Sequence, residues 1–460
     1  MRVGFYGGVE GVTGSCFLLE VDNKKILIDC GLFQGTEEQK NYEPFPFEPK
    51  GIDYLILTHA HIDHCGRIPL LVKEGFRGRI ISTEATKRIA ILMLLDAAKV
   101  MYENYKVQLK KLLRTGKVPS PPLYQDYEVL DSIDFFNIGL TYGRSFSISN
   151  NVKVTFKDAG HILGSAFVEI EVYENKKNKR IVFSGDLGNK GKPIIRDPQK
   201  PSKADYVFVE TTYGDRNHKG FEESKEELLE AVTYALSRGG NVLIPSYALE
   251  RAQEILFVLR DFYENGKLPE CRVFLDSPLA TNLTALFKSH PEFFDEETYQ
   301  IFLERDPFKF PNLYFTKEVE ESKSINSITS GAIIIAGSGM LTGGRILHHL
   351  KHNLWRPECS LVFVGYQPKG TLGRRIIEGE SPVKIFGEEI EVKARIYTIN
   401  GFSSHTDQKG LLEWLSFTQK PKKVFLIHGE KEKKEVFKQK LIDTLGFKPH
   451  LPIYGEVIDL

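Results

Sequence analysis

Short apolar runs separated by glycines and polar turn residues fill the first third of the chain. The runs VGFYGG, CFLLEV and KILIDCG follow one another closely, with a D-N turn between the last two. Runs of β-branched and aromatic residues bounded by such turns are typical of strands, and their order predicts an antiparallel sheet. Residues 84–114 instead carry apolar positions at helical spacing with no internal Pro or Gly, which predicts one long helix.

The pattern changes along the rest of the chain. Strands are predicted at VKVTFKDAGH, AFVEIEV, RIVFSGD and YVFVETTYG. From about residue 215 apolar strands alternate with amphipathic helices, as in NVLIPS followed by LERAQEILFVLRDFY, and this alternation predicts a parallel α/β sheet. The chain has 460 residues, which is more than a single hydrophobic core usually serves, so we expect two domains.

The composition is that of an ordinary globular protein, with 41% hydrophobic and 27% charged residues. The 61 basic side chains balance 61 acidic ones, so affinity for a polyanion must come from a local patch or from bound metal. Five cysteines without a C-x-x-C pair argue against a disulfide framework and favour a reducing compartment. No apolar run approaches the roughly 20 residues of a membrane helix, and the N-terminus lacks the apolar core of a secretion signal. We therefore expect a cytoplasmic protein without a membrane span, whose oligomeric state the sequence leaves open.

Three histidines and one aspartate follow directly after the apolar run at 54–57. The segment is T-H-A-H-I-D-H, with the ligand candidates His59, His61, Asp63 and His64. A lone histidine is more often a satisfied polar group, but a buried cluster of this kind is costly without a partner. Imidazole and carboxylate suit Zn²⁺, and the lack of a cysteine ligand argues against a closed structural site.

Histidine and aspartate recur after three later strands, each time beside a glycine. The segments D-A-G-H, S-G-D and I-H-G add His161, Asp186 and His428. Each of these alone could be an ordinary loop residue, but together they bring the candidates to five histidines and two aspartates. That is the inventory of a two-metal site with one shared carboxylate, and such sites activate water for in-line attack on a phosphoryl centre.

This series of motifs resembles the metallo-β-lactamase fold, an αββα sandwich of two packed sheets with helices outside. The resemblance covers residues 1–208 and 393–460, so we expect residues 209–392 to form an inserted domain. Asp29, in ILIDCG, matches an early aspartate that usually orients the metal loop in this family without binding metal. The resemblance implies two zinc ions bridged by Asp186, and whether Mn²⁺ can replace them stays open. The remaining ligands would be His59, His61 and His161 on one ion and Asp63, His64 and His428 on the other.

Three further segments resemble motifs A, B and C of the β-CASP nucleases: V-E-T-T-Y-G at 209–214, G-F-S-S-H-T-D at 401–407 and F-L-I-H-G-E at 425–430. NVLIPSYALERAQE, FLDSPLA and GSGMLTGGR are similar to the inserted domain of that group, which implies a parallel α/β β-CASP domain. The resemblance makes His405 the general acid for the leaving oxygen and Glu210 the carboxylate that raises its pKa. It also gives Asp63 a catalytic role, and Ser403 and Ser404 a role in substrate binding.

Histidine at the third motif is typical of the RNA-processing members of this group, whereas DNA-repair members have an apolar residue there. His428 therefore points to a zinc-dependent ribonuclease that cuts phosphodiester bonds of single-stranded RNA in RNA processing or decay. The expected cut is endonucleolytic, with 5′–3′ exonucleolytic cutting left open, and we expect the inserted domain to exclude a duplex. The alternatives are a small-molecule metallohydrolase acting on thioesters or lactones, and a non-catalytic RNA-binding scaffold.

The glycine-rich segment GSGMLTGGR lies between a predicted strand and a predicted helix, where backbone N–H groups can hold a phosphate. Its glycines could equally serve tight packing. Ser338, Gly339 and Arg345 are therefore candidate substrate-binding residues. Further candidates for contacts to the RNA backbone are Lys369, Arg374 and Arg375.

Overall fold

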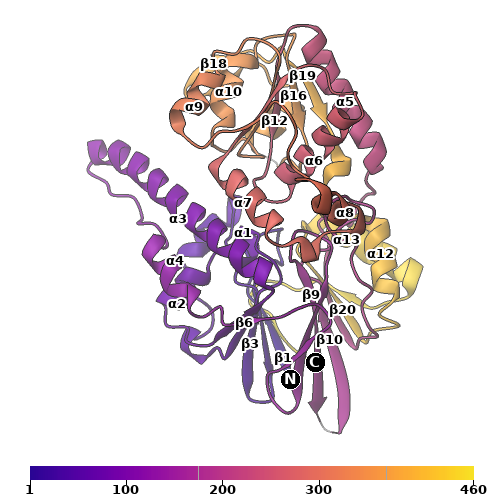
Figure 1. Ribbon diagram of the computed structural model, residues 1–460. Helices are drawn as coiled ribbons and strands as arrows, with labels where there is room; N and C mark the ends of the chain where they lie inside the picture. The colour runs from indigo at the N-terminus through magenta and orange to yellow at the C-terminus, as the bar shows by residue number, and fades with distance from the viewer. Residues whose placement is uncertain (175, 369) are drawn as a thin grey trace. The chain divides into compact units, whose positions relative to one another are not determined.

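The computed structural model describes residues 1–174, 176–368 and 370–460, so Lys369 lies outside the described residues. This part of the chain divides into two compact units (Figure 1). Unit 1 comprises Met1–Lys190, Asp197–Asn217 and His405–Leu460, and unit 2 comprises Gly191–Arg196 and His218–Ser404. The domain bounds expected from the sequence, at 208/209 and 392/393, stay a prediction.

Two seven-stranded sheets form the centre of unit 1, with the strand orders β22-β1-β2-β3-β4-β5-β6 and β21-β20-β11-β10-β9-β8-β7. The strands of the first sheet are β1 (Arg2–Phe5), β2 (Phe17–Val21), β3 (Lys24–Ile28), β4 (Tyr54–Ile56), β5 (Arg79–Ser82), β6 (Ile138–Gly139) and β22 (Val457–Asp459). Those of the second are β7 (Ser145–Ser147), β8 (Val152–Asp158), β9 (Ala166–Glu174), β10 (Lys177–Phe183), β11 (Tyr206–Glu210), β20 (Lys423–Ile427) and β21 (Pro449–His450). The antiparallel start predicted from the sequence is confirmed, because β2 pairs antiparallel with both β1 and β3.

Alternating side chains of these strands form separate apolar layers, because successive residues of a strand point to opposite faces. Between the sheets, Phe5 of β1 lies 5.8 Å from Phe208 and 5.5 Å from Phe425, measured between ring centroids. The other face of the second sheet packs against α12 (Gln408–Ser416) and α13 (Lys431–Leu445). This arrangement gives the αββα sandwich that the resemblance implied.

The outer helices of the first sheet are α2 (Ile68–Lys73), α3 (Glu84–Leu112) and α4 (Asp126–Ile133) (Figure 1). α3 confirms the long helix predicted over 84–114. Thr83 caps it, since the Thr83 hydroxyl accepts a hydrogen bond from the backbone N–H of Thr86 at 3.1 Å. Within the described residues, no helix is both long and apolar enough to cross a membrane.

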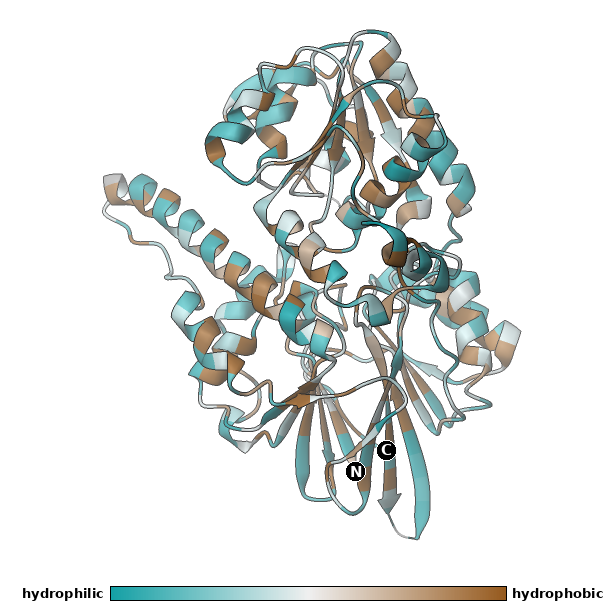
Figure 2. Ribbon diagram, in the orientation of Figure 1, coloured by the Kyte–Doolittle hydropathy of each residue, from teal (hydrophilic) through white to brown (hydrophobic). Residues whose placement is uncertain are grey.

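Unit 2 is built on one six-stranded sheet with the order β14-β13-β15-β12-β16-β19. Its strands are β12 (Val242–Pro245), β13 (Arg272–Asp276), β14 (Leu313–Phe315), β15 (Ala332–Ala336), β16 (Ser360–Phe363) and β19 (Arg395–Thr398). Neighbouring strands all pair in parallel, which confirms the parallel α/β arrangement predicted for the middle of the chain. In Figure 2 these strands are largely brown, as expected for a sheet buried on both faces.

Helices cover both faces of this sheet and form two apolar cores. One core includes α5 (Phe221–Ser237) and α6 (Arg251–Glu264), and the other includes α10 (Ile346–Asn353) and α11 (Leu372–Ile377). Further elements of the unit are α7 (Pro278–Lys288), α8 (Glu296–Glu304), α9 (Val319–Ile325), the short helices η4 (Pro291–Phe293) and η5 (Asn400–Phe402), and the hairpin of β17 (Val383–Ile385) and β18 (Glu388–Ile390).

Candidate metal centre

The carboxyl ends of several strands in unit 1 carry the chemistry-bearing side chains. In the second sheet β8 and β10 both pair antiparallel with β9, so they run in the same direction. β11 pairs parallel with β10 and β20 pairs parallel with β11, so all four strands end at the same side of the sheet. His161 follows β8, Asp186 follows β10, Glu210 ends β11 and His428 follows β20. In the first sheet Asp29 follows β3, and the H-x-H-x-D-H segment follows β4. Residues far apart in the sequence therefore meet at one edge.

Tight turns place these side chains immediately beyond their strands. Asp29 and His428 have positive φ values of 58° and 48°, a conformation that costs free energy in a residue other than glycine. Gly185, with φ 53°, precedes Asp186, and a Cβ atom on it would lie 2.9 Å from the Thr58 Cβ. The turn into Asp186 thus needs glycine both for its conformation and for its closeness to Thr58.

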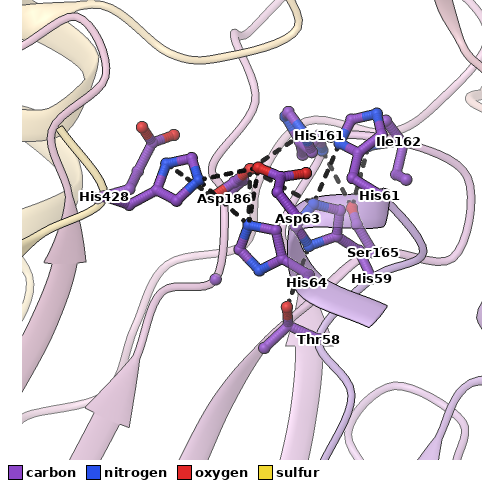
Figure 3. A network of polar contacts seen from close by, with 12 residues as sticks. Thr58, His59, His61, Asp63, His64, His161, Ile162, Ser165, Asp186 and His428 are labelled. Carbon is purple, nitrogen blue, oxygen red and sulfur yellow. Dashed lines mark hydrogen bonds and ion pairs between the residues drawn. The ribbon is translucent and has the colours of Figure 1, made fainter. Parts of the chain in front are cut away.

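A first group of ligands surrounds one oxygen of Asp186 (Figure 3). The Asp186 Oδ2 atom lies 3.4 Å from Nε2 of His59 and 3.6 Å from Nε2 of His161. Nδ1 of His61 lies 3.2 Å from Nε2 of His59 and 3.1 Å from Nε2 of His161. These four side chains each offer a ligand atom within 4.8 Å of the other three.

A second group shares Asp186 with the first. Nε2 of His64 lies 3.3 Å from Asp186 Oδ2 and 3.3 Å from Nε2 of His428. Asp63 Oδ2 lies 3.3 Å from His428 Nε2, and Asp186 Oδ1 lies 3.5 Å from His428 Nδ1. Asp63, His64, Asp186 and His428 again offer ligand atoms that lie within 4.8 Å of one another. The structure thus brings all seven ligand candidates together in two groups with one common carboxylate.

The chemistry of this donor set fits divalent metal ions. Zinc bonds of about 2.0–2.2 Å put tetrahedral ligand atoms about 3.3 Å apart, close to the separations found in both groups. Burial lowers the pKa of His59 to about 3 and that of His61 to about 4, so both imidazoles are neutral and present lone pairs. In addition, Asp186 Oδ1 is buried and accepts no hydrogen bond from the described residues.

Three neighbouring side chains orient the histidine ligands. Asp29 accepts hydrogen bonds from the backbone N–H and the hydroxyl of Thr58, both at 2.8 Å, and lies 2.7 Å from His64 Nδ1. The Thr58 hydroxyl lies 3.0 Å from His59 Nδ1, and the Thr212 hydroxyl lies 3.1 Å from His428 Nδ1. These contacts direct Nε2 of each ring toward the ligand group. Neither Thr58 nor Thr212 was predicted from the sequence to have a role, although both flank ligand or motif residues in T-H-A-H and E-T-T-Y.

Glu210 and His405 form a polar pair beside the ligands. The buried carboxylate of Glu210 accepts hydrogen bonds from the backbone N–H groups of Leu187 at 2.9 Å and Thr212 at 3.1 Å. Its Oε1 atom lies 3.1 Å from His405 Nδ1, and His405 Nε2 lies 4.0 Å from Asp186 Oδ2. Burial opposes a positive charge on His405, but the attraction of Glu210 and Asp186 outweighs burial and raises its pKa to about 9. With Nδ1 facing Glu210, the Nε2 proton of His405 is directed toward Asp186.

The other candidate residues belong to unit 2 and are Ser338, Gly339, Arg345, Arg374, Arg375, Ser403 and Ser404. Arg345 donates hydrogen bonds to Asp276 Oδ1 at 2.7 Å and to the Lys317 carbonyl oxygen at 2.6 Å. Ser404 accepts a hydrogen bond from Arg251 at 3.0 Å. Arg374 and Arg375 are paired with Glu378 and Glu380 on the same stretch of chain. RNA binding by these side chains stays a prediction.

Family models match three stretches of the chain. Residues 9–90 match the metallo-beta-lactamase superfamily, 252–376 match the Beta-Casp domain, and 389–452 match the Zn-dependent metallo-hydrolase RNA specificity domain. Together these matches cover more than half of the chain.

Named relatives align over nearly the whole chain. Ribonuclease TTHA0252 of Thermus thermophilus is 42% identical over 458 residues, which cover 99% of this chain and 99% of that protein. Transcription termination factor FttA of Methanosarcina mazei is 32% identical, over 94% of this chain and 67% of that protein. A crystal structure of a protein of unknown function from Enterococcus faecalis V583 covers 100% of this chain with a TM-score of 0.55 and 13% identity, and shows the shared fold alone.

Proposed function

This chain belongs to the β-CASP nucleases of the metallo-β-lactamase superfamily, which are metal-dependent hydrolases, and we propose that it cuts single-stranded RNA with two zinc ions. The position of Asp186 is the main support for this proposal, because Asp186 is common to two groups of candidate ligands and lies beside the Nε2 atom of His405. The match of residues 389–452 to an RNA specificity domain supports RNA as the substrate. The relative from Thermus thermophilus, named a ribonuclease, supports the same substrate.

The two groups of side chains would hold the metal ions, with Asp186 common to both. When bound, such a pair of ions polarises phosphoryl oxygens and lowers the pKa of water so that it acts as the nucleophile. The protein keeps His59 and His61 neutral by burial, so these two rings are ready as ligands, and Asp29 orients the ring of His64.

The leaving 3′-oxygen needs a proton, because an alkoxide is strongly basic. We assign this step to His405, which would donate its Nε2 proton while Glu210 holds Nδ1 and stabilises the charged ring. Glu210 is itself fixed by the two backbone N–H groups whose hydrogen bonds it accepts, so the pair has one orientation. The products would be a 5′-phosphate and a 3′-hydroxyl.

The test uses purified protein whose metal content has been measured, incubated with end-labelled single-stranded RNA, duplex RNA and single-stranded DNA of one sequence. We expect about two zinc ions per chain, since seven ligands exceed the four of one tetrahedral site, and rapid cutting of the single-stranded RNA alone. RNA binding without cutting would make the chain a scaffold. Hydrolysis of a generic thioester without RNA cutting would make it a small-molecule hydrolase, and equal cutting of the duplex would contradict the preference for single strands.

A further inference from the structure

The second half of α3 extends from unit 1 without packing into its core. The last buried residue of the helix is Ala98, and from residue 99 to the helix end at Leu112 no described side chain is buried. At about 1.5 Å per residue, this stretch is about 21 Å long. Figure 1 shows it extending past α4, away from the two sheets. We call residues 99–117, which include the short helix η3 (Leu113–Thr115), the α3 arm.

The α3 arm is strongly basic, although the charges of the whole chain balance. It contains five lysines and one arginine against a single acidic residue, Glu103, while the whole chain has 61 basic and 61 acidic residues. Glu103 is paired with Lys106 at 2.9 Å. The other lysines of the arm, Lys99, Lys110, Lys111 and Lys117, are exposed and form no ion pair with a described residue. The arm therefore presents uncompensated positive charge.

Three lysines of the arm, including the paired Lys106, form a stripe along the helix. Lys99, Lys106 and Lys110 are seven and four residues apart, so they project within about 20° of one direction over about 17 Å. Tyr102 lies beside the stripe, with its side chain 45% exposed and its ring centroid 4.7 Å from Lys106 Nζ. An aromatic ring set among lysines is the combination that proteins use to bind single-stranded nucleic acid, by stacking on bases and pairing with phosphates.

Electrostatics favours a negatively charged partner for this surface. Lys106 and Lys110 are four residues apart, so they repel each other at helical spacing. A polyanion would relieve the repulsion. The exposed aliphatic residues of the arm are Val100, Val107 and Leu113, whereas Met101, Tyr105, Leu109 and Leu112 are half-buried. Leu113 lies on a different side of the helix from the two valines, so the three exposed residues form no continuous apolar face of the kind that a membrane-binding helix has, which favours a nucleic acid over a lipid surface.

We infer that the α3 arm binds the backbone of the RNA outside the cleavage site, with Lys99, Lys106 and Lys110 at phosphates and Tyr102 against a base. This inference rests on the proposed RNA nuclease function and adds a second contact region for the same substrate. Its consequence is that long RNA, which reaches the arm, binds more tightly than short RNA, which occupies the metal centre alone.

The test compares the parent with the triple variant Lys99→Gln, Lys106→Gln, Lys110→Gln. The matched control is Lys153→Gln, Lys176→Gln, Lys177→Gln, which removes three exposed charges from the same unit. Lys153 lies at the start of β8, Lys176 directly precedes β10 and Lys177 begins it. All three are thus at the opposite end of these strands from His161 and Asp186, which follow β8 and β10. All six side chains are exposed or half-buried, so both variants are expected to fold like the parent.

Steady-state cleavage is measured on an RNA of about 30 nucleotides and on one of about 6, at several salt concentrations, together with anisotropy of the labelled long RNA. For the long RNA the triple variant should raise KM with kcat unchanged. The salt slope of its binding should fall by about 2, because each phosphate that a lysine neutralises on a single strand contributes about 0.7 to that slope. Tyr102→Ala should weaken binding of the long RNA about 5- to 100-fold. The short RNA and the control variant should match the parent.

Two failures are distinguishable in this experiment. A parent that binds long RNA through the arm lysines but cuts no RNA would overturn the proposed nuclease function and keep the arm as an RNA-binding surface. Equal KM, salt slope and anisotropy for the parent and the triple variant would overturn the inference about the arm. Binding of the parent and the triple variant to anionic vesicles and to an acidic peptide is measured in parallel. If the triple variant lost that binding but kept RNA binding, the inference would be overturned as well.

Discussion

Two buried aspartates, one in each unit, show how a complete polar cluster differs from a set of candidate metal ligands. Asp276 ends β13 of unit 2, and Asp186 follows β10 of unit 1. Asp276 accepts hydrogen bonds from Thr316 at 2.7 Å, from Ser322 at 2.6 Å and from Arg345 at 2.7 Å, and it lies 2.6 Å from His349 Nε2. Its negative charge is therefore balanced by hydroxyl, guanidinium and imidazole donors of the protein itself.

Asp186 has a different set of neighbours. It is surrounded by imidazoles that burial keeps neutral in at least two cases, and its Oδ1 atom accepts no hydrogen bond from the described residues. A buried carboxylate oxygen without a hydrogen-bond donor is costly, and a bound metal ion would satisfy it. A buried aspartate near histidine is therefore not enough to indicate a metal site. What decides is whether the protein supplies the donors that satisfy the carboxylate.

The largest effect is expected from Asp186→Asn. The shared carboxylate would become a neutral amide, so both groups should lose affinity, with less than one zinc ion left per chain and RNA cleavage abolished. Elemental analysis and cleavage of labelled RNA measure both. Asp276→Asn is the matched control and should keep the metal content of the parent. An Asp186→Asn variant that retained two ions would break the comparison.

His405→Ala should lower the cleavage rate by about 10² to 10⁴, because the leaving oxygen would lose its proton donor. The variant should keep both metal ions and its affinity for RNA, which elemental analysis and anisotropy would show. His428→Ala is the contrasting change and should lose one ion. If His405→Ala emptied a metal site or cut RNA as fast as the parent, the acid role of His405 would be wrong.

Asp276→Asn should reduce the stability of unit 2 by about 3–5 kcal/mol, since it breaks a buried charge pair and removes the carboxylate that balances the guanidinium of Arg345. Although burial opposes it, hydrogen bonding from His349 and its neighbours lowers the pKa of Asp276 to about 2. A lowered pKa means that the contribution is fully present above about pH 4 and is lost as the pH falls through about 2.

Thermal unfolding of the parent and of Asp276→Asn, followed by calorimetry from pH 7 down to pH 2, measures this contribution. The difference between the two proteins should shrink at the acidic end. A constant difference over this range would show that the carboxylate charge is not what stabilises the cluster.

Thr212→Val should have the smallest effect of the four. It keeps the shape of the side chain but removes the hydroxyl beside His428 Nδ1, so His428 would be less well oriented. Loss of such an orienting contact typically weakens metal binding about 10- to 100-fold. Competition with a chelator of known affinity measures the change, with Thr211→Val as a neighbouring control whose hydroxyl binds the Ile427 carbonyl oxygen. Equal metal affinity of the Thr212→Val variant and the parent would give Thr212 no orienting role.

Local patterns in the sequence were sufficient for the elements and for the ligand candidates. Alternation of apolar residues predicted the antiparallel start of the chain, and its change to strand and helix predicted the parallel sheet of unit 2. Histidine and aspartate directly after apolar runs also named the seven residues that the structure brings together in two groups that could hold a metal ion, and metal binding by them stays a prediction. In α3 the helical spacing predicted the helix but not where its packing ends at Ala98, because spacing does not show which neighbours a helix has.

The sequence by itself determined which residue types end each strand, since strand patterns and turn glycines are local properties of the chain. Only the tertiary structure decided how these ends are grouped, because the contacts join residues that are far apart, as His64 and His428 do at 3.3 Å. The same holds for Asp186 and Asp276, which both follow apolar strands in the sequence. Whether such a carboxylate meets hydroxyl donors or neutral imidazoles depends on side chains from other strands and helices, and only folding brings these together.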